Sequence, residues 1–337
     1  MDKIGNKKVV TFGEVMLRLS PPGHATFSQV TSLDMTFGGG EANVAISLAY
    51  MGLDVIHVTR FPDNFIGKAA TQFLRHHWVD TSKVIFGDQH MGKYFLEIGA
   101  IHRPSQVIYE RDNSAFAMIT PDMFDWDEIL NGADWFHWTG ITPGISAGVA
   151  QSCQDAIRKA NELGITVSGD IHSRASLWQY GKDQKEVLPD MIGGTDVVVG
   201  SEYDINKVFS RLSDAHFSAA ADGLMKLYPS IKKVVDKDRT SLNASHNLIK
   251  GKLWNGEQLV QSPEFDITPI IGRVGTGDAF AAGLIYGLLN FNDDYDTINF
   301  ASAACSLKHT VEGDANVVSA ESVANLMNGN TSATIHR

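Results

Sequence analysis

A chain of 337 residues is long enough for one large α/β domain, or for a domain that carries a smaller appendage. Its 28 basic and 39 acidic residues give a formal net charge of -11, which argues against general binding to nucleic acid or to anionic membranes. Two cysteines far apart in sequence supply neither a disulfide framework nor clustered metal ligands. Since the N-terminus is polar and no apolar run reaches membrane-spanning length, the sequence predicts a cytoplasmic protein.

Two early segments have strand character without a helical period. Residues 14–37 include the alternating stretch Met16-Leu17-Arg18-Leu19, and residues 84–118 include two short apolar runs. We expect these segments to form a small β-sheet lid on an α/β core built from the remainder of a single domain, residues 1–337. A small exposed sheet needs a second layer, so we also expect a homodimer formed through the lid, or a larger oligomer.

The rest of the chain alternates strands with helices, which implies a mostly parallel central sheet flanked by helices on both faces. Asn255-Gly256 adds a strong signal for an antiparallel hairpin. The predicted strands are 8–12, 55–59, 135–138, 165–168, 197–199, 231–235, 248–254 and 257–260, and the predicted helices are 41–50, 147–163, 204–209, 218–227 and 279–289.

The most informative stretch is Gly275-Thr276-Gly277-Asp278, which leads into a helix that is apolar on every side. Two glycines let the backbone turn tightly and point several N–H groups one way, and the helix adds the positive end of its dipole. Such a turn suits an anion, for example a phosphoryl group that gains charge. Asp278 would then accept a proton from a neighbouring hydroxyl, although the same pattern also fits a glycine turn with a capping Asp.

A second glycine cluster, Gly38-Gly39-Gly40, also runs into a predicted buried helix. Consecutive glycines allow a ligand to approach the backbone closely, and Asn43 would present its amide from the first helical turn. A plain loop-to-helix junction has the same sequence pattern. Neither cluster fits the dinucleotide or Walker phosphate-loop spacing, so those two kinds of site are not expected.

Arginines supply a third group of candidates, because a guanidinium is the natural fork for a carboxylate or phosphate. Arg103, Arg111 and Arg174 lie in mostly apolar or aromatic contexts, whereas an ordinary arginine is a solvated surface residue. Tyr109 and Arg111 are two residues apart on a predicted strand and would therefore share one face.

One further motif points to a different enzyme class. The stretch 144–148 fits Gly-x-Ser-x-Gly, the pattern of a hydrolase nucleophile elbow, with Ser146 as the nucleophile. Ser146 is equally a good N-cap for the helix predicted at 147–163, and we prefer that interpretation. The twelve histidines include no zinc-protease spacing.

With these residues identified, the chain resembles the ribokinase-like (phosphofructokinase-B family) carbohydrate kinases, and within them the 2-keto-3-deoxygluconate kinases. The family's early Gly-Gly-x-x-x-Asn and late Gly-x-Gly-Asp-x-Phe signatures match Gly39 to Asn43 and Gly275 to Phe280. The resemblance implies a ribokinase-like fold, the cofactors ATP and Mg²⁺, and a sugar acid as the small-molecule partner.

The resemblance also implies roles for individual residues. Asp278 would be the catalytic base, and Gly275, Thr276 and Gly277 the anion hole. The implied sugar-acid contacts are Gly39, Gly40, Asn43, Tyr94, Tyr109, Arg111, Arg174 and Asp278, and the implied nucleotide contacts are His172, Ser201, Arg239 and the anion hole itself. Asp204 would serve the metal, and the hairpin near Asn255 would lie beside the nucleotide.

The chain departs from the family pattern in four stretches, all on its nucleotide or cation side. Ser201 and Asp204 replace the Asn and Glu of an Asn-x-x-Glu motif, and His172 replaces an Asn. Lys237-Asp238-Arg239 replaces Thr-Leu-Arg. Gly272 stands where an acidic residue is usual, so a monovalent cation beside the anion hole would lose a ligand.

The sequence therefore predicts phosphoryl transfer from ATP to the primary hydroxyl of a sugar acid, with 2-keto-3-deoxygluconate giving the 6-phosphate. A kinase of the same fold that acts on fructose or a nucleoside is one alternative, and it predicts that Arg111 and Arg174 do not converge on one pocket. A catalytically weak sugar-acid sensor is another. The sugar's stereochemistry, the preferred nucleotide and the oligomer size are left open.

Overall fold

The computed structural model describes residues 7–172, 174, 176–209 and 216–330, so both ends of the predicted domain 1–337 lie outside it. Within these residues, nine strands form one large sheet in the order β14-β13-β12-β11-β10-β9-β1-β4, with β15 paired to β13. Pairing is parallel from β4 to β12 and antiparallel beyond it. The strands are β1 (Lys8–Phe12), β4 (Asp54–Val58), β9 (Trp135–Thr139), β10 (Thr166–Asp170), β11 (Val197–Val199), β12 (Lys233–Asn243), β13 (His246–Trp254), β14 (Leu259–Gln261) and β15 (Phe265–Ile267).

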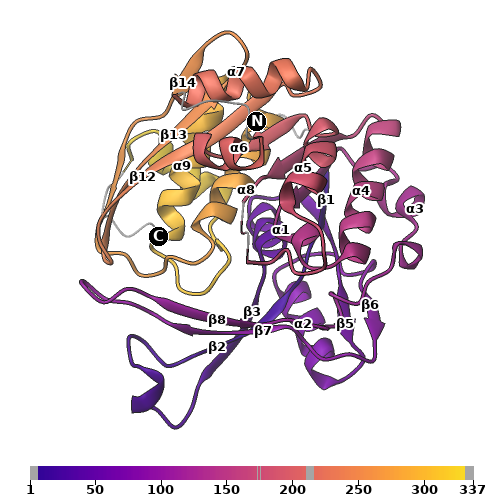
Figure 1. The fold of residues 1–337 in the computed structure, drawn as a ribbon. Helices are drawn as coiled ribbons and strands as arrows, with labels where there is room; N and C mark the ends of the chain where they lie inside the picture. The colour runs from indigo at the N-terminus through magenta and orange to yellow at the C-terminus, as the bar shows by residue number, and fades with distance from the viewer. Residues whose placement is uncertain (1–6, 173, 175, 210–215, 331–337) are drawn as a thin grey trace.

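Helices cover both faces of this sheet, as predicted (Figure 1). One helix layer contains the C-terminal helices and covers one face of the sheet. The other layer covers the opposite face, over β9, β10 and β11. The first layer comprises α1 (Gly40–Tyr50), α2 (Phe65–His76), α8 (Thr276–Asn290), α9 (Asp294–Lys308) and α10 (Ala320–Met327), and the second α3 (Trp126–Leu130), α4 (Ala147–Glu162), α5 (Gln184–Gly193), α6 (Glu202–Val208) and α7 (Phe217–Leu227). No described helix is both long and apolar enough to cross a membrane.

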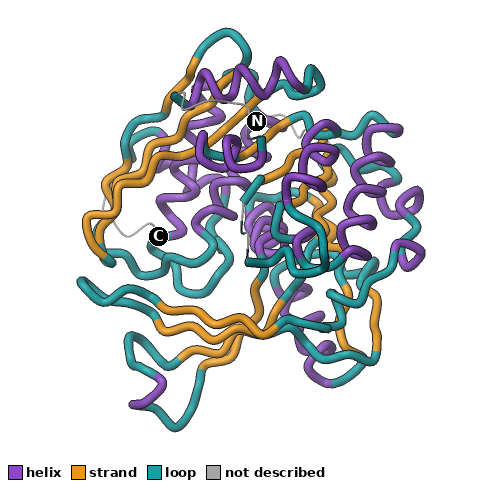
Figure 2. Tube along the Cα trace, viewed as in Figure 1, coloured by secondary structure: helices purple, strands orange, loops and turns teal. Residues whose placement is uncertain are grey.

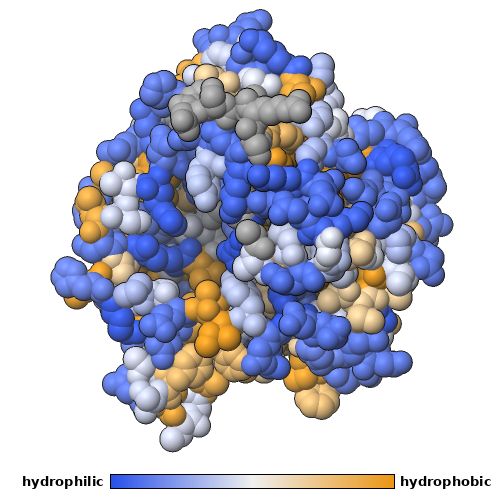
Figure 3. Space-filling model, in the orientation of Figure 1, coloured by the Kyte–Doolittle hydropathy of each residue, from blue (hydrophilic) through white to orange (hydrophobic). Residues whose placement is uncertain are grey.

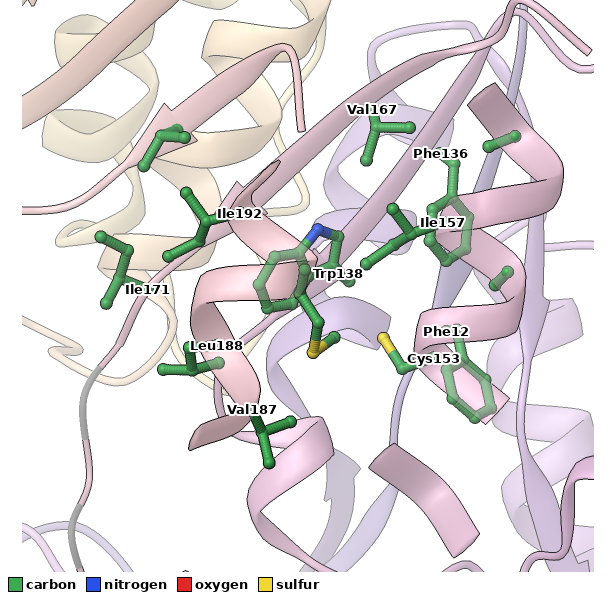
Figure 4. Packing of buried hydrophobic residues seen from close by; sticks show 14 of the residues in the cluster. Phe12, Phe136, Trp138, Cys153, Ile157, Val167, Ile171, Val187, Leu188 and Ile192 are labelled. Atoms are coloured by element: carbon green, nitrogen blue, oxygen red, sulfur yellow. The ribbon is translucent and has the colours of Figure 1, made fainter. Parts of the chain in front are cut away.

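Strand periodicity explains why both faces need covering. Side chains alternate across a strand, so Val10 and Phe12 of β1 pack into one hydrophobic cluster while Val9 packs into the other. Figure 4 shows the first cluster, in which Trp138 of β9 lies between residues of α4 and of α5. A sheet buried in this way reads as continuous apolar runs, which is how the sequence identified its strands.

The small sheet lies apart from the large one and has the order β3-β2-β7-β8 (Figures 1 and 2). Its strands are β2 (Met16–Ser20), β3 (Asp34–Gly38), β7 (Lys93–Glu97) and β8 (Gln106–Glu110). All four come from the two segments predicted to form the lid, and we call them the lid sheet. At the tip of the β7–β8 hairpin, the Ile101 carbonyl accepts a hydrogen bond of 2.8 Å from Ala244 N, in the turn between β12 and β13.

Several elements differ from the sequence-based assignment. β6 (Ile85–Gly87), inside the predicted lid segment, instead pairs with β5 (Arg60–Pro62) in a separate two-stranded sheet. β12 is much longer than predicted, because its polar C-terminal half pairs with β13 at the edge of the sheet. Helices α2, α3, α5, α9 and α10 were not anticipated. In α9 the cause is a mixed composition of small and polar residues, which are buried here only by tertiary packing.

Candidate active site

The predicted site residues converge on one cavity of about 620 Å³ between the large sheet and the lid sheet. It lies beyond the carboxyl ends of β1, β10 and β11, next to the place where the chain order reverses between β1 and β9. Open parallel sheets commonly bind ligands at such a switch point. The lining includes all the predicted contacts, namely Gly39, Gly40, Asn43, Tyr94, Tyr109, Arg111, His172, Arg174, Ser201, Asp204, Arg239, Gly275, Thr276, Gly277 and Asp278.

The late glycine turn begins α8. Gly275 has φ 77°, in the left-handed region that glycine adopts without penalty, and a Cβ there would overlap the Asp314 carbonyl oxygen. The first N–H groups of a helix have no partner within the helix, so this turn presents donors to the cavity at the positive end of the α8 dipole. Lys237 of β12 lies beside it. Its Nζ is 3.7 Å from the position of a Cβ at Gly277 and 4.9 Å from the centroid of the Phe280 ring.

Asp278 lies in the first turn of α8, with its carboxylate facing the early glycine cluster. Asn43 Nδ2 donates a hydrogen bond of 2.7 Å to Asp278 Oδ2. Withdrawal from water raises the pKa of Asp278 to about 7, against the lowering effects of Asn43 and His172. Asp170 and Glu41 raise the pKa further by repulsion between like charges. A carboxyl group with its pKa near neutrality suits a general base.

His172 follows β10 with φ 35°, which is uncommon outside glycine. Its Nδ1 lies 3.9 Å from Asp170 Oδ2, and its Nε2 accepts a hydrogen bond of 3.1 Å from Arg174 Nε. Burial lowers the pKa of His172, but the hydrogen bond and charge of Asp170 raise it more, so the net change is upward. His172 therefore lies between Asp170, Arg174 and the Asp278 carboxylate.

The early glycine cluster brings α1 against the strand ends. A Cβ at Gly39 would overlap the Glu14 carbonyl oxygen, and one at Gly40 would lie 3.8 Å from Asp278 Oδ1. The next residue, Glu41, is buried. Burial raises its pKa, although its Oε1 accepts hydrogen bonds from Thr139 N and Oγ1 and from Thr142 Oγ1. These bonds tie the start of α1 to the end of β9.

The two arginines predicted to hold a carboxylate are in different electrostatic settings. The Nε of Arg111 donates to Glu14 Oε2 at 2.7 Å, and its Nη2 binds the same oxygen, so a buried ion pair matches its charge. Arg174 Nη1 instead donates to Tyr109 Oη at 3.2 Å, with the guanidinium 5.8 Å from the Tyr109 ring centroid. Among the described residues, no carboxylate pairs with Arg174, which leaves its charge open to the cavity.

At the end of the cavity predicted to bind the nucleotide, Ser201 and Asp204 are hydrogen-bonded to each other. Ser201 is the N-cap of α6, its Oγ accepts a bond of 3.1 Å from Asp204 N, and it donates one of 2.6 Å to Asp204 Oδ2. Arg239 lines the cavity, but Asn255 does not and binds Asp294 instead. Across the described part of the chain, no group of three or more His, Cys, Asp and Glu side chains is placed to hold a metal ion.

Sequence reasoning assigned no role to several lining residues, among them Glu14, Asp170, Lys237 and Asp314. Asp170 could have been found, because it follows the predicted core strand 165–168 by two residues and parallel strands end at a common edge. For Asp314, which binds Arg18 and Tyr94 of the lid sheet, the sequence carries no such signal. Ser146 is the N-cap of α4, because its Oγ accepts a hydrogen bond of 3.3 Å from Val149 N. This is the role that the sequence analysis preferred over a catalytic nucleophile.

Comparison with known proteins identifies the family of this chain. The family model for pfkB family carbohydrate kinases matches residues 6–321. A 2-dehydro-3-deoxygalactonokinase of Haloferax volcanii is 30% identical over 96% of this chain and 97% of its own. The solved structure of a 2-dehydro-3-deoxygluconokinase from Thermotoga maritima has a TM-score of 0.91 and 42% identity, covering 96% of this chain and 99% of its own. This chain belongs to the pfkB family of carbohydrate kinases.

Proposed function

We propose that this kinase transfers the terminal phosphoryl group of ATP to the primary hydroxyl of 2-keto-3-deoxygluconate, or of its C4 epimer. Both relatives described above are named for such sugar acids. The observation that carries the proposal is the unmatched charge of Arg174 in the same cavity as Asp278. A sugar acid fits both groups at once, with its carboxylate at one end and its primary hydroxyl at the other.

Asp278 takes the proton of the attacking hydroxyl as the new O–P bond forms and the bond from the γ-phosphorus to the β–γ bridging oxygen breaks, releasing ADP. Its pKa near 7 keeps much of Asp278 deprotonated at neutral pH. The N–H groups of the Gly275 turn stabilise charge on the phosphoryl oxygens. Lys237 adds a positive charge beside the turn, where the family pattern has an uncharged residue. Asn43 orients the Asp278 carboxylate.

At the other end of the cavity, Arg174 binds the substrate carboxylate through the fork geometry of its guanidinium. Tyr109 joins Arg174 to the lid sheet, so substrate binding and lid position are linked. Arg111, matched by Glu14, holds the lid strand β8 against the loop after β1 and contributes little net charge to the substrate.

The residues present suit MgATP. Ser201, Arg239 and the anion hole line the nucleotide end of the cavity, and Asp204 would reach the metal through water, as Mg²⁺ commonly permits. Bound Mg²⁺ would neutralise charge on the triphosphate oxygens.

The test is ADP release by the purified protein with MgATP over a panel of sugar acids and their neutral counterparts. Arg174→Ala should raise the activation free energy for the sugar acid, as measured by kcat/KM, by about 1.5–3 kcal/mol, the usual worth of a hydrogen bond to a charged group. The loss on a neutral sugar should be much smaller. Arg158→Ala, which removes an exposed arginine of α4, is the matched control. Equal losses on both substrates would show that Arg174 does not recognise the carboxylate. ADP formation with fructose alone would favour the neutral-sugar alternative.

We also propose a homodimer formed through the lid sheet. All five residues of β8 are exposed, and among them Ile108 does not line the cavity, whereas Tyr94 and Leu96 of β7 are buried. Figure 3 shows hydrophobic surface gathered over this sheet. A second copy of the chain would cover it.

A further inference from the structure

Lys308, the last residue of α9, is a fully buried lysine that the proposed mechanism does not use. Its Nζ donates hydrogen bonds of 2.9 Å to the Val311 carbonyl and 3.0 Å to the Gly313 carbonyl. Among the described residues, no carboxylate lies at ion-pair distance from it. A buried ammonium held by backbone carbonyls alone is costly, which points to a use for the charge.

The segment that Lys308 holds supports the catalytic turn. The Asp314 carbonyl packs under Gly275, and the Asp314 carboxylate binds Arg18 and Tyr94 of the lid sheet. Before the turn, Gly272 N donates a bond of 3.1 Å to the His309 carbonyl. The Lys308 ammonium therefore lies behind the anion hole, where two chain segments and the lid meet.

This place does not fit a monovalent metal cation bound as the family resemblance implies. A Cβ at Gly272 would lie 2.5 Å from the Val311 carbonyl oxygen and 3.3 Å from Lys308 Nζ. A carboxylate side chain therefore has no room unless the loop moves, and an ammonium already takes the carbonyl oxygens. Carbonyl oxygens are the ligands that also bind K⁺.

We propose that the Lys308 ammonium is a built-in monovalent cation, which holds the segment after α9 and the Gly275 turn in place without K⁺ or Na⁺. The inference rests on the proposed kinase reaction. It makes Lys308 a positioning residue, since the ammonium acts through Val311 and Gly313 rather than by touching substrate.

The pKa of Lys308 is consistent with a positively charged side chain at neutral pH. Burial lowers its pKa to about 8, Arg18 adds repulsion, and Asp314, Asp278 and Cys305 act in the opposite direction. The ammonium is therefore largely present at neutral pH and is lost as pH rises through 8.

The first test uses the unmodified enzyme and needs no variant. ADP release with a sugar acid is measured in buffer whose only monovalent cation is choline, and then with K⁺, Na⁺ or NH₄⁺ at constant ionic strength. We expect less than about twofold change, because exposed charges are screened equally in each case. Strong stimulation by K⁺ alone would overturn the inference and leave the proposed function intact. Absence of ADP formation with every sugar acid would refute the function instead.

The second test is chemical rescue. Lys308→Ala should lose about 10²-fold in kcat/KM, the cost of a misplaced site, and should recover at least about tenfold with K⁺ or NH₄⁺ but not with choline. Lys233→Ala, which removes a lysine paired with Asp294 at the other end of α9, should show no cation response. A folded Lys308→Ala enzyme that no cation restores would contradict the proposal. If that variant does not fold, the response of the unmodified enzyme decides.

Discussion

The protonation state of Asp278 should control the rate of this kinase. A folded-state pKa of about 7 lies well above the ordinary value of 3.8, and burial is its main cause. The base works when deprotonated, so kcat/KM should fall as pH drops below 7. It should reach about a tenth of its plateau at pH 6 and about a hundredth at pH 5, as expected for one titrating group.

The assay is ADP release at saturating MgATP and low sugar acid, measured from about pH 5 to pH 8. Groups facing Asp278 come from α1 (Asn43 and Glu41) and from the end of β10 and the loop after it (Asp170 and His172). Because His172 lowers the pKa of Asp278, His172→Gln should move the acid limb to higher pH. A flat profile from pH 5 to 8, or a limb that does not move in this variant, would refute the reasoning. At pH 8, where the wild-type carboxylate is deprotonated, Asp278→Asn should lose about 10²–10⁴-fold in kcat, and its profile should lack the acid limb.

Three further predictions follow from the surroundings of the cavity. Lys237→Met keeps the apolar stem and removes the charge beside the anion hole, so kcat should fall about 10²-fold, with Lys237→Arg as the control; an unchanged kcat would remove Lys237 from the site. Ile108→Glu adds a charge to an exposed residue of β8 and should convert a dimer to monomers in sedimentation; monomeric wild-type protein would exclude the lid dimer. Ser201→Asn with Asp204→Glu preserves the capping box and should lower the KM for MgATP with little change in the sugar KM; an unaltered KM would show that these departures are neutral.

The sequence predicted the parts of the site that are local in the chain. Each glycine cluster and its helix lie within a few consecutive residues, so the turn, the dipole and the position of Asp278 follow from short-range rules. The strands of the parallel core were identifiable for a similar reason, since burial on both faces makes their apolar runs continuous. Helix α9 was not predicted from the sequence, because its small and polar residues have no periodic apolar face of their own.

What the sequence could not supply were charge pairings between distant segments. Glu14 and Arg111 are 97 residues apart, and nothing near either residue indicates that one neutralises the other. Arg111 and Arg174 therefore looked equivalent as carboxylate ligands, although only one has an unmatched charge in the cavity. Electrostatic roles depend on partners that folding brings together, and so require coordinates.

At Gly272 and Lys308, too, the sequence and the structure lead to different interpretations. In sequence, Gly272 looks like a simple loss, because a residue without a side chain can offer no oxygen to a cation. In the structure the missing side chain is what leaves room for the Val311 carbonyl, and that carbonyl is one of the two that bind Lys308. Restoring an acidic residue at 272 alone would therefore force the carbonyl away from the ammonium. Gly272 and Lys308 are 36 residues apart in the sequence, yet folding brings both against the same Val311 carbonyl.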